Sequence, residues 1–243
     1  MNQQQWIGLS IDGIRIKVAE GTTLLKAAKE AGIEIPTLCC LEESDPKAVC
    51  RLCVVETEDG ILITACSTLC AENMCIQTHS KKVREARRFT LKLLLTRHLN
   101  SCFACDRSAE CADRLKALCN YDKNCFTCGY NRDCKLRRYC LEYNVDAREF
   151  PVLAQEKKLQ KLSNVLIYDP NRCILCRNCK DICSKLDGDI ALLGRGINAE
   201  MDFSFCDSDY CMQCGKCMEA CPTGALSAID EKESDHEILA GGQ

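Results

Sequence analysis

The chain has 243 residues, with 32 lysines and arginines against 35 aspartates and glutamates, a formal charge of −3 and a pI near 5.8. This weakly acidic balance argues against a nucleic-acid-binding surface. No run approaches the roughly 20 apolar residues that a membrane-spanning helix needs, so we expect no membrane span. Only 5% of the residues are aromatic, which favours several small modules over one large core.

Cysteine is unusually abundant, at 24 residues. In a short secreted protein this content would indicate a disulfide scaffold. The segment from Met1 to Trp6 lacks the charged and apolar regions of a secretory leader. We therefore expect a cytoplasmic protein whose cysteines bind metal, with metal binding contributing to its folding free energy.

The N-terminal segment predicts a β-hairpin, a helix and a cysteine loop. Residues 6–18 alternate apolar and polar side chains about Asp12–Gly13, the pattern of a two-residue hairpin. The apolar positions from Leu24 to Ala31 share one helical face. Strand-like segments return after Cys53, so the order is that of a β-grasp 2Fe–2S ferredoxin. The cysteines that would hold this cluster are Cys39, Cys50, Cys53 and Cys66, with a wider first gap than in plant-type ferredoxins.

Residues 80–97 predict an amphipathic helix with a basic face. The simplest interpretation of the basic face is that it is solvated. A docking surface for an acidic partner is the alternative.

Residues 98–140 contain an internal repeat with the spacing Cys-x2-Cys-x5-Cys. The first copy is Cys102, Cys105 and Cys111, and the second is Cys125, Cys128 and Cys134. Each copy offers three thiolates and needs a fourth ligand. His98 is the candidate for the first copy. Cys119 is preferred for the second copy, with Cys140 as the alternative.

Two runs near the C-terminus have the spacing Cys-x2-Cys-x2-Cys-x3-Cys, which is typical of two-cluster bacterial ferredoxins. In this pattern the fourth cysteine of each run binds the neighbouring 4Fe–4S cluster. Structural zinc also takes four thiolates, but zinc sites usually combine separated Cys-x2-Cys pairs. One cluster would be held by Cys173, Cys176, Cys179 and Cys221, and the other by Cys211, Cys214, Cys217 and Cys183.

These patterns predict an α+β chain of three modules. They are a β-grasp 2Fe–2S ferredoxin module, a small helical His/Cys 4Fe–4S module with the duplicated motif, and a two-cluster bacterial-ferredoxin-like module. The predicted boundaries are 1–80, 81–145 and 165–230, with a linker at 146–164 and a flexible tail at 231–243.

The module order resembles the N-terminal iron–sulfur region of three related proteins. These are the large iron–sulfur subunit of complex I, NAD-linked formate dehydrogenases and multi-cluster iron-only hydrogenases. Matching segments include Cys50–Glu56, Ala65–Thr68, His98 with its trio, Cys134–Cys140 and Cys221–Leu226. Those proteins continue into a catalytic domain, whereas this sequence ends soon after Leu226. The resemblance therefore implies one 2Fe–2S and four 4Fe–4S clusters and no catalysis by this chain alone.

Five cysteines remain outside these ligand sets, and buried inert thiols are the expectation for all of them. They are Cys40, Cys70, Cys75, Cys140 and Cys206.

The function that follows is electron transfer. We expect the iron–sulfur subunit of a soluble, hetero-oligomeric, flavin-containing NAD(P)-linked oxidoreductase. Its partners would be an NAD(P)H-oxidising flavoprotein and a further redox subunit or ferredoxin. An electron-bifurcating transhydrogenase is the specific expectation. The alternatives are an electron-transfer subunit of a formate dehydrogenase or hydrogenase with a separate catalytic chain, and a structural or regulatory metal-binding adaptor.

Overall fold

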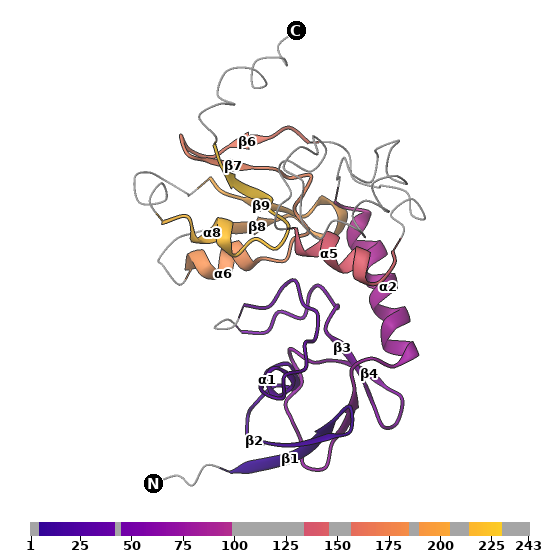
Figure 1. The fold of residues 1–243 in the computed structure, drawn as a ribbon. Helices are drawn as coiled ribbons and strands as arrows, with labels where there is room; N and C mark the ends of the chain where they lie inside the picture. The colour runs from indigo at the N-terminus through magenta and orange to yellow at the C-terminus, as the bar shows by residue number, and fades with distance from the viewer. Residues whose placement is uncertain are drawn as a thin grey trace. The chain divides into compact units, whose positions relative to one another are not determined.

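The structure is a computed structural model, and it describes residues 5–41, 45–98, 134–145, 157–184, 190–204 and 214–229. The described chain divides into two compact units. The N-terminal unit comprises the described residues of 1–95 and 135–150, and the C-terminal unit comprises those of 96–134 and 151–243. Each unit mixes helices and strands (Figure 1), in agreement with a mixed α/β protein.

The N-terminal unit is built on a five-stranded sheet. In chain order its elements are β1 (Trp6–Ile11), β2 (Ile14–Ala19), α1 (Leu24–Glu30), β3 (Val54–Thr57), β4 (Leu62–Thr64), β5 (Cys75–Gln77), α2 (Lys81–Leu95) and α5 (Lys135–Glu142). The strand order is β2-β1-β5-β3-β4. β5 runs parallel to β1 and antiparallel to β3, so this short strand, which the sequence did not indicate, joins the hairpin to the strands beside the cysteine loop.

The predicted hairpin and the predicted first helix are both confirmed. Asp12 and Gly13 have φ values of 49° and 84°, the left-handed values that a two-residue turn requires. Thr23 caps α1, because its side chain accepts a hydrogen bond from the backbone N–H of Lys26. Apolar residues from α1 and the sheet then form a buried core that includes Leu9, Ile11, Val18, Leu24, Ala27, Ala28, Val55 and Ile76.

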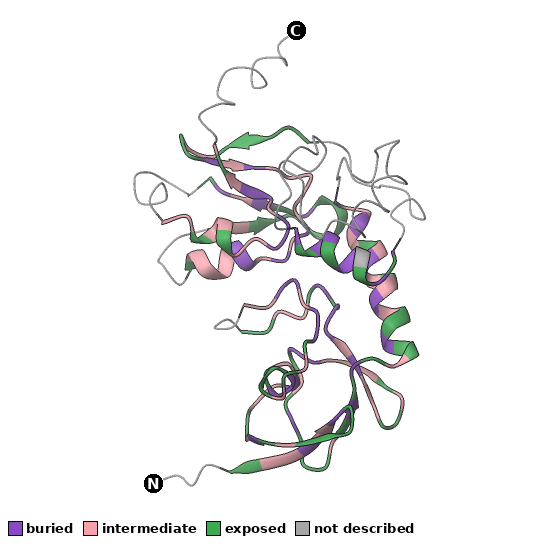
Figure 2. Cartoon of the chain, viewed as in Figure 1, coloured by how far each residue is buried: buried purple, intermediate pink, exposed green. Residues whose placement is uncertain are grey.

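The predicted amphipathic helix is present as α2, but the expectation that its basic face is solvated is wrong at Arg87. Buried and exposed positions alternate along α2 (Figure 2), and Arg87 is fully buried. Its guanidinium donates hydrogen bonds of 2.8 Å to the Tyr143 hydroxyl and to the carbonyl of Val54. The cation is therefore a tie between α2, β3 and the chain just after α5.

The C-terminal unit contains two small sheets. Its described elements are β6 (Gln160–Lys161), β7 (Leu166–Tyr168), α6 (Asn178–Ser184), β8 (Ala191–Leu193), the 3-10 helix η2 (Gly196–Asn198), β9 (Glu200–Asp202), α8 (Lys216–Glu219) and β10 (Leu226–Ala228). β7 lies between β10 and β6, and β8 pairs with β9. All of these pairings are antiparallel.

The core of the C-terminal unit is small and includes cysteines. Leu166, Tyr168, Ile190 and Phe203 are buried in it, and Cys173, Cys183, Cys217 and Cys221 pack against it. The rings of Tyr168 and Phe203 lie 4.7 Å apart between centroids. Among the helices of the described residues, none has the length and apolar character needed to cross a membrane.

Candidate iron–sulfur sites

In the N-terminal unit, the four cysteines predicted for the 2Fe–2S cluster are all buried. Cys39 follows the chain leaving α1, Cys50 and Cys53 lie in the loop that enters β3, and Cys66 follows β4. The backbone N–H of Cys50 donates a hydrogen bond of 3.4 Å to Sγ of Cys39. Arg51, between the two loop cysteines, has a left-handed φ of 54°. The loop therefore curls sharply between Cys50 and Cys53.

These thiols interact as two pairs. Cys39 hydrogen-bonds to Cys50 and Cys53 to Cys66. The shared proton and burial raise the pKa of Cys39 and of Cys53. The same hydrogen bonds lower the pKa of Cys50 to about 6 and that of Cys66 to about 7. Because the thiolate is the form that binds metal, one member of each pair is prepared for ligation.

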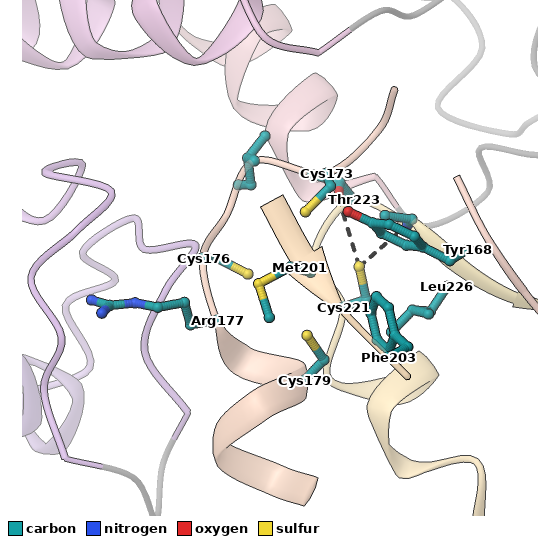
Figure 3. Close-up of a pocket in the computed structure, with 12 residues that line it drawn as sticks. Tyr168, Cys173, Cys176, Arg177, Cys179, Met201, Phe203, Cys221, Thr223 and Leu226 are labelled. Atoms are coloured by element: carbon teal, nitrogen blue, oxygen red, sulfur yellow. Dashed lines mark hydrogen bonds between the residues drawn. The ribbon is translucent and has the colours of Figure 1, made fainter. Parts of the chain in front are cut away.

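In the C-terminal unit, Cys173, Cys176, Cys179 and Cys221 line one cavity (Figure 3). The first three come from the loop that leads into α6, and Cys221 follows α8. Leu175 and Arg177 flank Cys176 and have φ values of 55° and 64°, so the loop coils around the cavity. The structure thus brings together the four residues that the spacing assigned to one cluster, including the distant fourth cysteine.

Hydrogen bonds reach the sulfur atoms of this cavity from backbone and side chains. Backbone N–H groups donate to Sγ of Cys173 from Leu175 at 3.5 Å and to Sγ of Cys221 from Ala225 at 3.2 Å. The Tyr168 side chain also hydrogen-bonds to Cys173. The hydroxyl of Thr223 lies 3.7 Å from Sγ of Cys221. Sequence reasoning missed Tyr168 and Thr223, because no spacing rule connects either residue to a thiolate.

Burial raises the pKa of Cys173 and Cys179 in this cavity. A thiolate there is costly unless a metal compensates it, and a coordinating metal deprotonates a thiol outright. The donor set therefore fits an iron–sulfur cluster. In such a cluster each thiolate binds a different iron, so the four sulfurs do not converge on one point. This agrees with the described residues, in which no three His, Cys, Asp or Glu side chains are arranged around a single ion.

The second predicted ferredoxin site is described in part. Burial raises the pKa of Cys217 to about 11, and the charges of Cys183 and Cys214 act in the same direction. Cys183 from α6 thus lies within electrostatic reach of Cys217 from α8. Its fourth predicted ligand, Cys211, lies outside the described residues.

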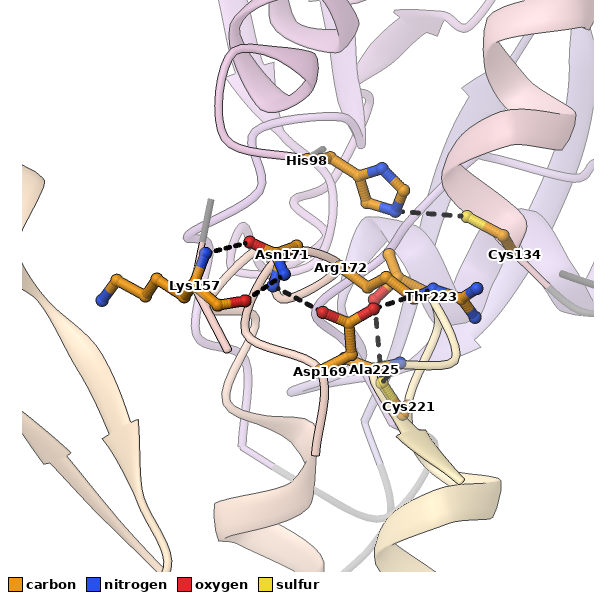
Figure 4. Close-up of polar contacts among 9 residues, drawn as sticks. All are labelled: His98, Cys134, Lys157, Asp169, Asn171, Arg172, Cys221, Thr223 and Ala225. Carbon is orange, nitrogen blue, oxygen red and sulfur yellow. Dashed lines mark hydrogen bonds and ion pairs between the residues drawn. The ribbon is translucent and has the colours of Figure 1, made fainter. Parts of the chain in front are cut away.

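His98 is buried and lies beside a thiol from the second copy of the repeat. Its Nε2 atom is 3.8 Å from Sγ of Cys134 (Figure 4). Burial, and then the charge of Arg172, lowers the pKa of His98 to about 4, so the imidazole is neutral. The predicted ligands between these two residues lie outside the described residues: Cys102, Cys105, Cys111, Cys119, Cys125 and Cys128.

The expectation that the five remaining cysteines are buried holds only in part. Cys70 and Cys140 are buried, whereas Cys40 is half-buried and Cys75 is exposed. The expectation is wrong for Cys75 because side chains alternate along β5, and Ile76 takes the inward position. Cys206 lies outside the described residues.

The comparisons with known proteins agree with this geometry. Residues 4–81 match the family described as "2Fe-2S iron-sulfur cluster binding domain". Residues 207–227 match the family described as "4Fe-4S binding domain".

Curated relatives match nearly the whole chain. A subunit of the NADH-quinone oxidoreductase of Rhizobium meliloti is 33% identical over 229 residues, covering 92% of this chain and 24% of that protein. The alpha subunit of the NADPH-Fe(3+) oxidoreductase of Geobacter sulfurreducens is 32% identical, covering 90% and 24%. The HndD subunit of the NADP-reducing hydrogenase of Solidesulfovibrio fructosivorans is 33% identical, covering 90% and 35%. The chain thus spans about a quarter to a third of the length of these relatives.

The fold is also found in a crystal structure of an NAD+-reducing [NiFe]-hydrogenase in the H2-reduced state. The TM-score is 0.72 at 24% sequence identity, with 93% of this chain and 88% of that chain covered. Together with the cysteine motifs, these comparisons show that the chain is a homologue of the iron–sulfur regions of NADH-quinone oxidoreductases, NADPH-linked oxidoreductases and related hydrogenases.

Proposed function

We propose that the chain is the electron-transfer subunit of a hetero-oligomeric, flavin-containing NAD(P)-linked oxidoreductase. The observation that carries this proposal is the presence of a separate set of thiols in each unit. One set is the four buried cysteines beside β3 and β4, and the other lines the cavity beside α6. Bound iron–sulfur clusters accept and release single electrons over a wide range of potentials. Two or more such sites in one chain suit stepwise electron transfer between partners.

The proposed ligand sets follow the thiol groups. Cys39, Cys50, Cys53 and Cys66 would hold a 2Fe–2S cluster. Two 4Fe–4S clusters would use the crosswise sets that contain Cys221 and Cys183. A further pair of 4Fe–4S clusters would use His98 and the cysteines of the repeat, from Cys102 to Cys134.

The finer proposal is an electron-bifurcating transhydrogenase in which an NAD(P)H-oxidising flavoprotein docks near the 2Fe–2S site and ferredoxin uses the two-cluster end. It is supported by relatives whose names include NADPH-Fe(3+) oxidoreductase and NADP-reducing hydrogenase. The second candidate is the electron-transfer subunit of a formate dehydrogenase or hydrogenase with a separate catalytic chain, because the matches also include a protein of Bacillus subtilis named as a formate dehydrogenase.

Iron analysis of the anaerobically reconstituted chain tests the cluster inventory. One 2Fe–2S and four 4Fe–4S clusters predict about eighteen irons per chain, together with a broad visible absorption that dithionite bleaches. A plateau near about fourteen would mean that the repeat holds one cluster fewer. A colourless protein that binds zinc would favour the metal-binding adaptor instead.

The proposed route is tested in the complex with a flavoprotein partner. Cys53→Ser should abolish reduction of the C-terminal clusters by NADH while dithionite still reduces them. Cys70→Ser is the matched control, because Cys70 is a buried thiol in the same unit outside the proposed ligand set. Reduction by NADH at the wild-type rate in Cys53→Ser would exclude this route.

A further inference from the structure

We infer that His98 and Cys134 bind the same 4Fe–4S cluster, so that the histidine-ligated site is closed across the duplicated motif. This inference rests on the proposed function, because it requires that the chain holds iron–sulfur clusters. It differs from the prediction made from spacing alone, which paired His98 with the three cysteines of the first copy.

The geometry of the pair is the first support. The two residues are separated by 36 positions in the sequence, yet Nε2 of His98 lies 3.8 Å from Sγ of Cys134. Both side chains are buried, with exposures of 1% and 3%. A buried imidazole and a buried thiol at this separation form a mixed nitrogen–sulfur donor pair.

The second support is the unsatisfied polar atom on the imidazole. Nδ1 of His98 is buried and has no hydrogen-bond partner within the part of the chain that the structure describes. A buried polar atom without a partner is costly. The ring is also neutral, which is the form in which histidine binds metal. A metal centre at this position would accept the imidazole in a chemically competent state.

The third support is the way in which the chain holds the pair. His98 follows α2 by three residues, and Cys134 directly precedes α5. The two helical segments are joined within the N-terminal unit, where Arg87 and Arg88 donate hydrogen bonds of 2.8 and 2.7 Å to the hydroxyl and the carbonyl of Tyr143. The chain segments that carry His98 and Cys134 therefore start from a fixed base.

The ligand count remains closed under this assignment. His98 and the seven cysteines from Cys102 to Cys134 supply eight ligands, which is the number that two 4Fe–4S clusters need. Assigning Cys134 to the histidine site leaves one thiolate of the first copy for the other cluster. The two copies would then share their ligands, in the same manner as the two ferredoxin runs.

Pulsed EPR of the full, anaerobically reconstituted chain tests the inference, because a directly bound imidazole nitrogen labels its cluster magnetically. We expect one reduced cluster with strong nitrogen coupling that His98→Ala removes. In Cys134→Ser the spectrum and midpoint potential of this same cluster should change. Clusters without nitrogen coupling should stay as in the wild type. Cys140→Ser is the matched control, since Cys140 is a buried thiol within α5, and it should leave the nitrogen-coupled cluster unchanged.

The inference is overturned if Cys134→Ser alters only a cluster without nitrogen coupling, or if Cys140→Ser reproduces its effect. It is also overturned if the wild-type chain contains clusters but none is coupled to nitrogen. A chain that binds no iron and sulfide would instead refute the proposed function. Should Cys134→Ser fail to assemble, Cys134→Ala provides a second measurement, in which a 3Fe–4S signal with retained nitrogen coupling is expected.

Discussion

The two units of the chain surround their thiols in different ways. In the N-terminal unit the four cysteines lie at the edge of a sheet-and-helix core, and they are 0% to 4% exposed. In the C-terminal unit Cys176 and Cys179 are 8% and 9% exposed, and Cys173, Cys183 and Cys221 are half-buried. There the cysteines themselves pack against a small core.

The difference teaches which unit depends on metal for its folding. The N-terminal unit has a hydrogen-bonded five-stranded sheet and apolar side chains that can be buried without iron. The C-terminal unit has strands of two or three residues and surrounds its ligand cavity with much of its apolar surface. For a unit of this kind the free energy of metal binding is largely folding free energy.

Removal of iron should therefore separate the two units, and this is the largest effect that we expect. After chelation under reducing conditions, amides of β7 and β10 should lose their protection from hydrogen exchange, because their packing depends on the cavity. Amides of β1, β2 and β3 should remain protected. Mass spectrometry of exchanged peptides measures both regions in one sample, and equal loss of protection in both would contradict the comparison.

Arg87→Met tests whether the N-terminal unit depends on its buried cation. The substitution leaves the Tyr143 hydroxyl and the Val54 carbonyl without their charged donor, so we expect a loss of about 2–4 kcal/mol in the free energy of unfolding. Denaturant unfolding of the iron-free chain, followed by circular dichroism, measures it. Lys81→Ala is the control on the same helix, since Lys81 is 92% exposed; its effect should stay within about 0.5 kcal/mol. Equal effects of the two substitutions would show that the buried contacts of Arg87 are dispensable.

Asn178→Ala tests the C-terminal unit in the same way. The side-chain amide of this buried residue of α6 donates a hydrogen bond of 3.2 Å to the carbonyl of Ala220, next to Cys221. Its loss should cost about 1 kcal/mol and accelerate iron release to a chelator about fivefold. Lys216→Ala on α8 is the exposed control. Because the unit needs iron, we expect no effect on the iron-free chain, and a change there would argue against the comparison.

The smallest effect is expected for Tyr168→Phe. The tyrosine hydroxyl hydrogen-bonds to Cys173, and such a bond stabilises the reduced, more negative cluster. Loss of one hydrogen bond of about 0.5–1.5 kcal/mol predicts a midpoint potential about 20–65 mV more negative. An EPR redox titration measures the shift.

Phe203→Leu is the control for Tyr168→Phe. It alters the ring packing against Tyr168 but keeps the hydroxyl. An equal shift in both variants would show that packing, and not the hydrogen bond, sets the potential.

The sequence by itself determined the local features of this protein. The turn at Asp12–Gly13, the cap at Thr23 and the coil of Cys173, Cys176 and Cys179 depend on residues a few positions apart. Backbone sterics and hydrogen bonding over such short separations follow rules that spacing expresses. Even the distant Cys221 was predicted, because its place in its own run identified its role.

Only the tertiary structure decided the contacts between residues far apart in the chain. The burial of Arg87, the insertion of β5 between β1 and β3, and the contact of His98 with Cys134 all join distant segments. The outward side chain of Cys75 follows from the strand pairing of β5. Such contacts depend on which surfaces pack together, a choice that no local period encodes. The repeat makes this plain, because its two copies offer similar thiolates and only folding selects between them.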